Sequence, residues 1–268
     1  MAYTFGFIGT GNMGGALAKA AAAVLPGEEI LLSNRTAAKA EALAAQLGCK
    51  AATVEEAANS SRYLFLGVKP QMMAGLFQKI IPVLQGREDR FILVSMAAGL
   101  TMADIQRMAG ADYPVIRIMP NTPVAVGGGV ILYDATENVT AEELTEFCQG
   151  LAAGGKLDRL PEKLIDAGSA VAGCGPAFAA MFIEALADGA VACGLPRKQA
   201  MEYAAQMLMG TAKLMLETGE HPGAMKDAVC SPGGSTIAGL KALEEGAFRA
   251  AAMNCVAATY NWNKELGK

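Results

Sequence analysis

The stretch YTFGFIGTGNMGGALAKAAA (Tyr3–Ala22) decides the fold of the N-terminal half. Its first seven residues are largely apolar and alternate, which predicts a buried strand. A GxGxxG motif and an Ala-rich helix follow. Glycines at this spacing let the backbone approach a pyrophosphate at the helix start and let the helix pack closely on the sheet. The stretch therefore predicts a dinucleotide site, and its expected cofactor contacts are Gly9, Gly11, Asn12, Met13 and Gly14.

The alternation of buried strands with helices continues to about residue 161. Further strands are expected at 28–34, 63–70, 91–99, 114–123, 127–134 and 156–161. This order predicts an α/β fold with a Rossmann-type, doubly wound and mostly parallel sheet. Ligands of such sheets lie at the carboxyl ends of the strands. The cofactor contacts expected there are Val68, Lys69, Pro70, Ala97 and Asn121. From one strand end alone, an ordinary exposed lysine is the favoured interpretation of Lys69, and Asn121 is similarly ambiguous. Pro120 and Pro123 predict a rigid loop that walls the nicotinamide pocket.

The end of the second strand bears on the choice of cofactor. NAD-binding domains usually place Asp or Glu there to hold the ribose 2′-hydroxyl. This chain instead has Ser33, Asn34 and Arg35, which offer hydroxyl, amide and guanidinium donors. These donors suit a 2′-phosphate, so NADPH is the expected cofactor and NADH remains possible. The alternative is that Arg35 is only a solvated loop residue.

From about residue 162 the strand pattern stops and the sequence predicts an all-α region. The expected domains are 1–161, which binds NAD(P), and 162–268, which is helical. Residues 176–194 are apolar almost all round, and such a helix must be buried. About a hundred residues do not easily cover several helices of this kind. The C-terminal helices are therefore expected to form a homodimer interface.

The segment SPGGST (231–236) precedes one of these helices. Pro232 and the two glycines break the preceding helix, and Ser235 or Thr236 is expected to cap a helix that begins at Ile237. The first turn of that helix has free N–H groups and the positive end of the helix dipole, which together suit a small anion. The segment alone is also compatible with an ordinary glycine-broken helix start, which is the more common case.

Composition excludes several classes of function. A net charge of −4 with no basic stripe argues against nucleic acid. No apolar run long enough for a membrane span and no leader segment are recognised, so no membrane association is expected. Six scattered cysteines without a CxxC pair indicate free thiols in a reducing, cytoplasmic setting.

Acid–base groups are scarce. His221, the only histidine, precedes a proline and is expected to cap a helix. Glu184 and Asp188 share a helix face and are expected to form a polar seam rather than an acid–base pair. No metal-ligand cluster is present in the sequence pattern. Such a chain suits a reaction in which hydride transfer does nearly everything, such as reduction of an imine that arrives protonated.

Seven segments, taken together, resemble the pyrroline-5-carboxylate reductase family. They are FIGTGNMGGAL, VKP, MPNTP, AGCGPAF, GLP, HPGAMKDAVCSPGGSTIAGL and LEEGAFR, and they occur in family order over nearly the whole chain. The resemblance implies hydride transfer from NAD(P)H to C5 of Δ1-pyrroline-5-carboxylate, which yields L-proline. It also implies interleaved helical dimers, with a decamer as the next level of assembly.

The resemblance further assigns the substrate site. The carboxylate would bind the backbone N–H groups around SPGGST, and the Thr236 hydroxyl, as the catalytic group, would hydrogen-bond the ring nitrogen. The implied substrate contacts are Ser231, Gly233, Gly234, Ser235 and Thr236. Ala172 and Cys174 depart from the family's usual Ser, and only a local packing change is expected from them.

Three other interpretations stay open from the sequence. A 3-hydroxyacid dehydrogenase would need a catalytic lysine in a glycine-rich helix, and that context is missing around Lys163, Lys198, Lys213, Lys226 and Lys241. A non-catalytic NADP-binding redox sensor would not need Thr236. An imine reductase for six-membered rings would differ only in pocket walls that the sequence does not reveal.

Overall fold

The computed structural model describes residues 3–266, and the chain divides into two compact units. The sheet unit runs to Cys174 and also takes in the C-terminal residues from Thr259 on. The helical unit is Gly175–Ala258. Residues 1–2 and 267–268 of the two predicted domains lie outside the described residues. The compact units divide at 174/175. This division is one of compactness and does not test the predicted boundary between functional domains at 161/162, which stays a prediction.

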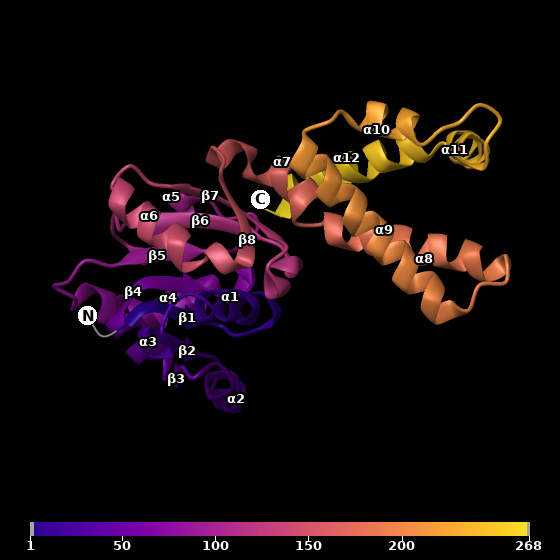
Figure 1. Cartoon of the computed structure of the whole chain (residues 1–268). Coiled ribbons are helices and arrows are strands. Elements are labelled where there is room, and N and C mark those ends of the chain that lie inside the picture. The colour runs from indigo at the N-terminus through magenta and orange to yellow at the C-terminus, as the bar shows by residue number, and fades with distance from the viewer. Residues whose placement is uncertain (1–2, 267–268) are drawn as a thin grey trace. The chain divides into compact units, whose positions relative to one another are not determined.

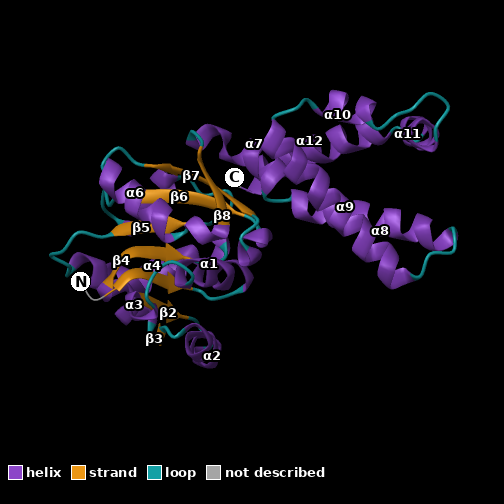
Figure 2. Ribbon diagram, in the orientation of Figure 1, coloured by secondary structure: helices purple, strands orange, loops and turns teal. Residues whose placement is uncertain are grey.

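The sheet unit is built on one eight-stranded sheet with the order β3-β2-β1-β4-β5-β6-β7-β8 (Figures 1 and 2). Neighbouring strands are parallel except for β6 and β7. The predicted doubly wound, mostly parallel sheet is therefore confirmed. The strands are β1 (Tyr3–Ile8), β2 (Ile30–Ser33), β3 (Lys50–Ala51), β4 (Ser61–Leu66), β5 (Ile92–Ser95), β6 (Val115–Pro120), β7 (Gly129–Ala135) and β8 (Gly155–Arg159).

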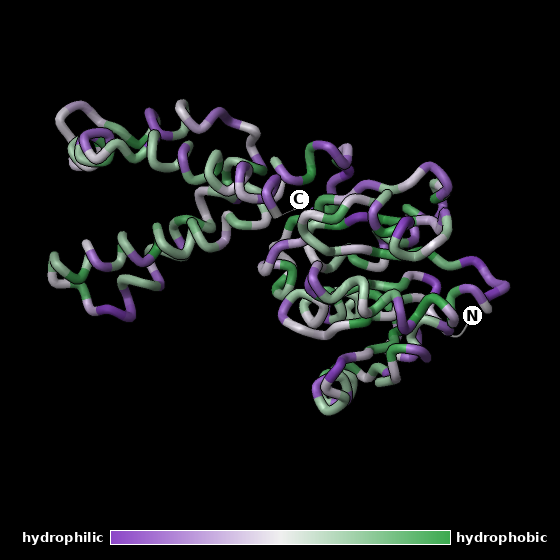
Figure 3. The backbone as a smooth tube through the Cα atoms, turned by 180° about the vertical axis from the view of Figure 1, so that it is seen from behind, coloured by the Kyte–Doolittle hydropathy of each residue, from purple (hydrophilic) through white to green (hydrophobic). Residues whose placement is uncertain are grey.

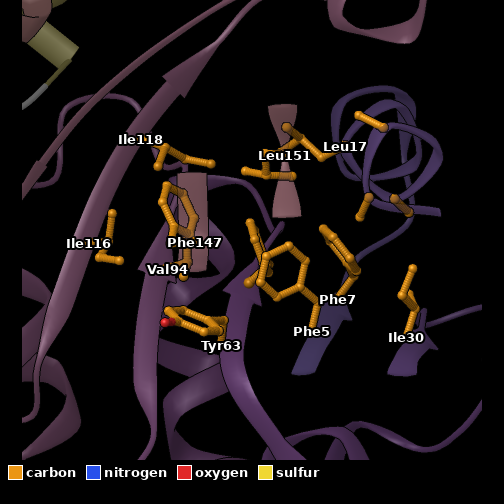
Figure 4. Close-up of a cluster of buried hydrophobic side chains, with 14 of the residues drawn as sticks. Phe5, Phe7, Leu17, Ile30, Tyr63, Val94, Ile116, Ile118, Phe147 and Leu151 are labelled. Atoms are coloured by element: carbon orange, nitrogen blue, oxygen red, sulfur yellow. The ribbon is translucent and has the colours of Figure 1, made fainter. Parts of the chain in front are cut away.

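Two apolar clusters, one on each face of the sheet, form the core. On one face, aromatic rings from β1 and β4 pack with Phe147 and with residues of α1, α2 and α6 (Figure 4). On the other face, Leu64 and Leu93 pack with residues of α3, α4 and α5. Because successive strand residues serve opposite faces, both parities must be apolar, which explains the nearly continuous apolar runs. The helices are α1 (Asn12–Ala22), α2 (Ala37–Leu47), α3 (Val54–Ser60), α4 (Met73–Gln85), α5 (Met102–Ala109) and α6 (Ala141–Gly150).

A seventh helix, α7 (Glu162–Ala172), completes the sheet unit and packs on β7. A side chain at Gly168 would meet Leu132 Cδ1 at 2.5 Å, so the helix lies close against the strand. The chain breaks after this helix, since α7 ends at Ala172 and a new helix begins at Gly175.

The helical unit contains α8 (Gly175–Ala192), α9 (Arg197–Thr218), α10 (Pro222–Ala228) and α11 (Ser235–Glu245), and α12 (Phe248–Leu266) begins in it. Hydrophobic residues follow one another along most of α8 (Figure 3). Even so, only Ala187, Ala200 and Ala204 are buried within this unit. The expectation that a single subunit leaves these helices uncovered agrees with this burial.

One sequence expectation about membranes needs correction. The helical run 162–192 is long and apolar enough to cross a membrane by length and composition. The reason is that Ala, Val, Leu, Ile and Met outweigh its few charged residues, although no uninterrupted apolar run exists. One such run is weak evidence, and its first part, α7, packs on the sheet.

Candidate functional site

The turn between β1 and α1 shows why each fingerprint glycine is needed. Gly9 has a φ of +100°, and a Cβ there would lie 2.4 Å from the carbonyl oxygen of Gly67. A Cβ on Gly14 would lie 2.0 Å from the carbonyl oxygen of Gly9. A Cβ on Gly11, in contrast, would meet nothing within 4 Å. Gly9 and Gly14 therefore serve the packing of the turn, while Gly11 borders open space in which a ligand can lie.

The start of α1 is suited to an anion. Gly11 is its N-cap and makes no side-chain cap, and the first turn carries no acidic residue. The first N–H groups of a helix have no partner within the helix, and the helix dipole makes this end positive. A phosphate can therefore accept hydrogen bonds here without competing with a carboxylate.

Backbone hydrogen bonds bring the neighbouring strand ends together. Gly9 N donates to Ser33 O at 2.8 Å, and Gly67 N donates to Ile8 O at 2.7 Å. The ends of β1, β2 and β4 are thereby joined, and β5 and β6 follow in the same direction. The cofactor contacts predicted after these five strands thus lie along one edge of the sheet.

Two buried hydroxyls at this edge have no hydrogen-bond partner among residues 3–266. They are Thr10 Oγ1, in the turn, and Ser33 Oγ, at the end of β2, where Ser33 is 1% exposed. A buried hydroxyl without a partner is costly, so both atoms fit a site completed by ligand oxygens. Thr10 was missed from the sequence because it fills a variable position of the fingerprint.

The three residues chosen as 2′-phosphate donors lie where β2 ends. Ser33 is buried, Asn34 is half-buried and Arg35 is exposed. Within the described part of the chain Arg35 makes no ion pair or hydrogen bond, and the first turn of α2 has no acidic residue. The donor set and the lack of a carboxylate suit a phosphate on the ribose. The glycine turn and this strand end together therefore fit NADP.

The other strand-end residues divide into exposed and buried ones. Lys69 is exposed and precedes the short 3-10 helix η2 (Pro70–Met72). Val68 and Ala97 pack against the cluster that contains Leu64, and Ala97 is 2% exposed. Any contact from Val68 or Ala97 to a cofactor would therefore rest mainly on their backbone.

Asn121, predicted as a cofactor contact, uses its side chain inside the protein. Its Nδ2 donates to Ala172 O at 2.9 Å, and its Oδ1 accepts from Val130 N at 2.9 Å. It is 6% exposed. These bonds join the end of β6 to β7 and to the last turn of α7, and they favour a structural role for the side chain.

In the helical unit, a tight turn leads into α11. Pro232 and Gly233 occupy its centre, Gly233 has a φ of +68°, and Gly234 N donates to Ser231 O at 3.0 Å. This pattern is typical of a type II turn, which needs glycine at its third residue. A Cβ on Gly234 would lie 2.4 Å from Ser231 Oγ, so a larger residue there would require the Ser231 side chain to move.

The predicted cap of α11 is wrong. Ser235 is the first helical residue rather than Ile237, and the extended Gly234 is the N-cap without any side-chain cap. The reason is the preceding turn, after which the backbone is already helical at Ser235. The N–H groups and hydroxyls of Ser235 and Thr236 are consequently left for another partner, and no acidic residue lies in the first turn.

Other candidate groups have structural roles. His221 is the N-cap of α10 and its Nδ1 accepts from Gly223 N at 3.1 Å, as predicted. Asp188 pairs with Arg197, in agreement with a polar rather than catalytic role. Among residues 3–266 no group of three His, Cys, Asp or Glu side chains could hold a metal ion.

Comparison with known proteins identifies the family. Residues 162–266 match a family model described as pyrroline-5-carboxylate reductase dimerisation, and residues 4–99 match one described as NADP oxidoreductase coenzyme F420-dependent. The chain is 40% identical to pyrroline-5-carboxylate reductase of Escherichia coli (strain K12) over 98% of both chains. The chain belongs to the pyrroline-5-carboxylate reductase family. The corresponding enzyme of Arabidopsis thaliana is 38% identical over 99% of this chain and 96% of its own.

A solved structure extends the family relationship to the fold. The crystal structure of Plasmodium falciparum pyrroline carboxylate reductase with NADP bound is 29% identical, with a TM-score of 0.88 over 99% of this chain and 98% of that one. The predicted order of a Rossmann-type sheet and a helical C-terminal region is thus confirmed. The match to a dimerisation model supports homo-oligomerisation of this member of the family.

Proposed function

We propose that this chain reduces L-Δ1-pyrroline-5-carboxylate to L-proline with NADPH, the last step of proline biosynthesis. In this reaction the C=N bond gains a hydride at C5 and a proton at nitrogen. The observation that carries the proposal is the uncapped start of α11, where Thr236 has an unengaged hydroxyl in a chain of this family. NADPH supplies the hydride, and NADH is a weaker alternative.

The sheet unit would hold the cofactor at the carboxyl edge of its strands. The N–H groups of Asn12, Met13 and Gly14 would bind the pyrophosphate, next to the open space at Gly11. Ser33, Asn34 and Arg35 would bind the 2′-phosphate. The exposed Lys69 would add a positive charge to the same edge, with the backbone around Val68, Pro70 and Ala97 beside it.

The turn before α11 would hold the substrate. A single carboxylate would accept hydrogen bonds from the N–H groups of Ser235 and Thr236, which the positive end of the helix dipole strengthens. Ser231 and Gly233 shape this cradle through the type II turn. The negative charge of the substrate is therefore bound without a lysine or arginine.

Thr236 would orient the imine. A hydroxyl can accept a hydrogen bond from a protonated ring nitrogen, which fixes the ring while C5 accepts the hydride. An imine that binds already protonated needs no strong acid from the protein, which fits the scarcity of such groups. Thr236 is thus the catalytic residue of the proposal.

The active protein would be a homodimer through its C-terminal helices, with a decamer as a further assembly. Large apolar side chains are exposed along α9, including Tyr203, Met207 and Leu214. Burial of this face against a second copy would remove it from water. A cytoplasmic location fits six scattered cysteines without a CxxC pair, and neither nucleic acid nor membrane is proposed as a partner.

A spectrophotometric assay tests the function. Oxidation of NADPH and of NADH would be followed at matched concentrations with pyrroline-5-carboxylate, and with its six-membered homologue as the control substrate. We expect rapid oxidation of NADPH with the five-membered imine and slower oxidation of NADH. Faster turnover of the six-membered imine would identify that imine as the preferred substrate. If neither imine causes NADPH or NADH oxidation, the proposal is contradicted.

A further inference from the structure

Strand β6 holds helix α7 at both ends of the helix. Near the start of α7, Arg117 donates to Asp166 Oδ1 at 2.9 Å and lies 3.4 Å from Glu162 Oε1. At the other end, Asn121 Nδ2 donates to Ala172 O. Arg117 and Asn121 are four residues apart in extended chain and so lie on the same face of β6.

The two anchors, Arg117 and Asn121, differ in their position relative to the expected cofactor site. Arg117 is 3% exposed, and its two acidic partners come from α7 itself. It fixes the first turns of the helix and lies three residues before the last residue of β6. Asn121 follows the last residue of β6 directly, at the edge where the cofactor contacts lie.

Asn121 connects three segments through its side-chain amide and its main-chain carbonyl. Its oxygen accepts from Val130 N in β7, its nitrogen donates to the last carbonyl of α7, and its own carbonyl accepts from Val124 N at 3.2 Å in the 3-10 helix η3 (Thr122–Val126). The last carbonyls of a helix have no partner within the helix, so this donor satisfies one of them. The primary amide supplies this donor and this acceptor from two separate atoms.

The carbonyl that Asn121 holds lies three residues before the helical unit begins. α7 ends at Ala172, and the chain enters α8 at Gly175. The connection is short, so the last turn of α7 sets the point at which the chain leaves the sheet unit. The loop Met119–Pro123 and this exit point are therefore held to each other by one side chain.

We propose that Asn121 is a positioning residue for hydride transfer rather than a ligand of the cofactor. It couples the strand-end loop Met119–Pro123, which is expected to wall the nicotinamide pocket, to the last turn of α7, and thereby holds that loop in the position that hydride transfer needs. This inference rests on the proposed function for its kinetic consequence. The coupling of the loop to α7 stands on the hydrogen bonds alone.

Asn121→Asp is the sharpest variant. It preserves shape and the acceptor for Val130 N, but it removes the donor and sets a carboxylate oxygen against the Ala172 carbonyl. Asn138→Asp is the matched control. Asn138 also donates from Nδ2 to a backbone carbonyl, that of Asp112 at 2.9 Å, and its Oδ1 also accepts one bond, from Thr136. It lies three residues beyond β7 and touches no proposed site.

Three readouts separate positioning from cofactor binding and from a purely structural role. For Asn121→Asp we expect kcat to fall about 10- to 100-fold, the scale of a displaced reacting group. The Kd of NADPH, from quenching or enhancement of its fluorescence, should change less than about twofold, since a lost direct contact would cost about tenfold or more. Amide hydrogen exchange of residues 170–176 should become faster. Asn138→Asp should leave all three as in the wild type.

Each outcome decides the proposal. A rise in NADPH Kd with kcat unchanged at saturation would make Asn121 a cofactor ligand and overturn it. Unchanged kcat with a lowered melting temperature would leave only a structural role. If the wild type reduces no imine, the proposed function fails, and hydrogen exchange alone decides on the coupling: unchanged exchange at 170–176 overturns it. Should Asn121→Asp fold poorly, Asn121→Ser would replace it, because it loses both bonds without adding charge. It is expected to lower kcat likewise and to leave the Kd of NADPH nearly unchanged.

Discussion

In the sheet unit, apolar side chains are buried on both faces of one sheet, whereas the helical unit buries only three alanines within itself. Phe5, Phe65 and Phe147 of the sheet unit are all 0% exposed. Met181 and Leu216 of the helical unit are 74% and 79% exposed. The first unit completes its core within one chain. The second has a comparable supply of apolar residues but needs a partner subunit to bury them. Folding stability therefore depends mainly on the sheet unit, and assembly depends mainly on the helical unit.

The largest expected effect comes from a charge on the uncovered face of α9. Met207→Glu places a carboxylate among Tyr203, Gly210 and Leu214, where burial against a second copy would leave it unpaired. We expect dissociation to monomers and loss of about 100-fold or more in activity at micromolar protein. Light scattering coupled to size exclusion measures the assembly. Val24→Glu, an exposed apolar residue of the sheet unit, is the control and should leave the assembly unchanged.

The next effect concerns the small polar site of the helical unit. Thr236→Ala removes the hydroxyl and keeps the start of α11, so turnover should fall about 10- to 1,000-fold, the range for one orienting or electrostatic donor. Circular dichroism and assembly should not change. Thr218→Ala, which removes a hydroxyl bonded within α9, should leave the rate near that of the wild type. Wild-type turnover in Thr236→Ala would end the proposed role of this residue.

A third comparison lies within the fingerprint itself. Gly11→Ala adds a methyl group in open space, so folding stability should stay constant while the Kd of NADPH rises about tenfold or more. Gly14→Ala forces a methyl group onto Gly9 O and should cost about 1–3 kcal/mol of folding free energy as well. Urea denaturation and fluorescence titration measure the two quantities. Equal loss of stability in both variants would contradict the distinction drawn between the two glycines.

The sheet unit should also carry an acid-sensitive link. Hydrogen bonds from Arg90 hold the pKa of the Glu143 carboxyl below its usual value, and a bond from Thr140 N acts in the same direction. A lowered carboxyl pKa stabilises the fold above the unfolded value of about 4.3 and loses this contribution as pH falls through the folded value. Glu143→Gln should therefore cost about 1–3 kcal/mol at pH 7 and much less near pH 3. Urea denaturation at the two pH values measures this, and a cost independent of pH would contradict it.

The smallest effect tests backbone strain in the helical unit. Ala247, between α11 and α12, has a φ of +53°, which is unfavourable for alanine and easily adopted by glycine. Ala247→Gly should stabilise the protein by about 0.5–1 kcal/mol. Ala251→Gly, inside α12, should destabilise it by a similar amount. Thermal melts of the two variants should move in opposite directions, and a shift of both in the same direction would argue against strain at Ala247.

The sequence was informative where local chemistry decides the structure. Alternating apolar strands and the fingerprint glycines predicted the doubly wound sheet, and His221 before Pro222 predicted the cap of α10. The predicted start of α11 was wrong because a type II turn at Pro232–Gly233 overrode the usual preference of Ser and Thr for the N-cap position. The two-residue strand β3 was missed because Lys50 and Ala51 are too few to show a pattern.

Partners distant in sequence could not be predicted. Arg117 in the apolar run VIRIMP signals a buried charge that needs a partner, but nothing in the sequence points to Glu162 and Asp166, which lie 45 and 49 residues later. Asn121 was assigned to the cofactor because of its place at a strand end, and the same place also brings it to α7. For the rest of the cofactor and substrate residues, the structure supplies a suitable setting, and their individual roles stay predictions.

The most direct measurement is product formation by the purified protein. Pyrroline-5-carboxylate and NADPH would be incubated with it, and L-proline would be quantified by chiral chromatography against the NADPH consumed. The account predicts one L-proline for each NADPH oxidised, with Thr236→Ala slowing both equally. Oxidation of NADPH without proline, or proline formed at the same rate by Thr236→Ala, would contradict it.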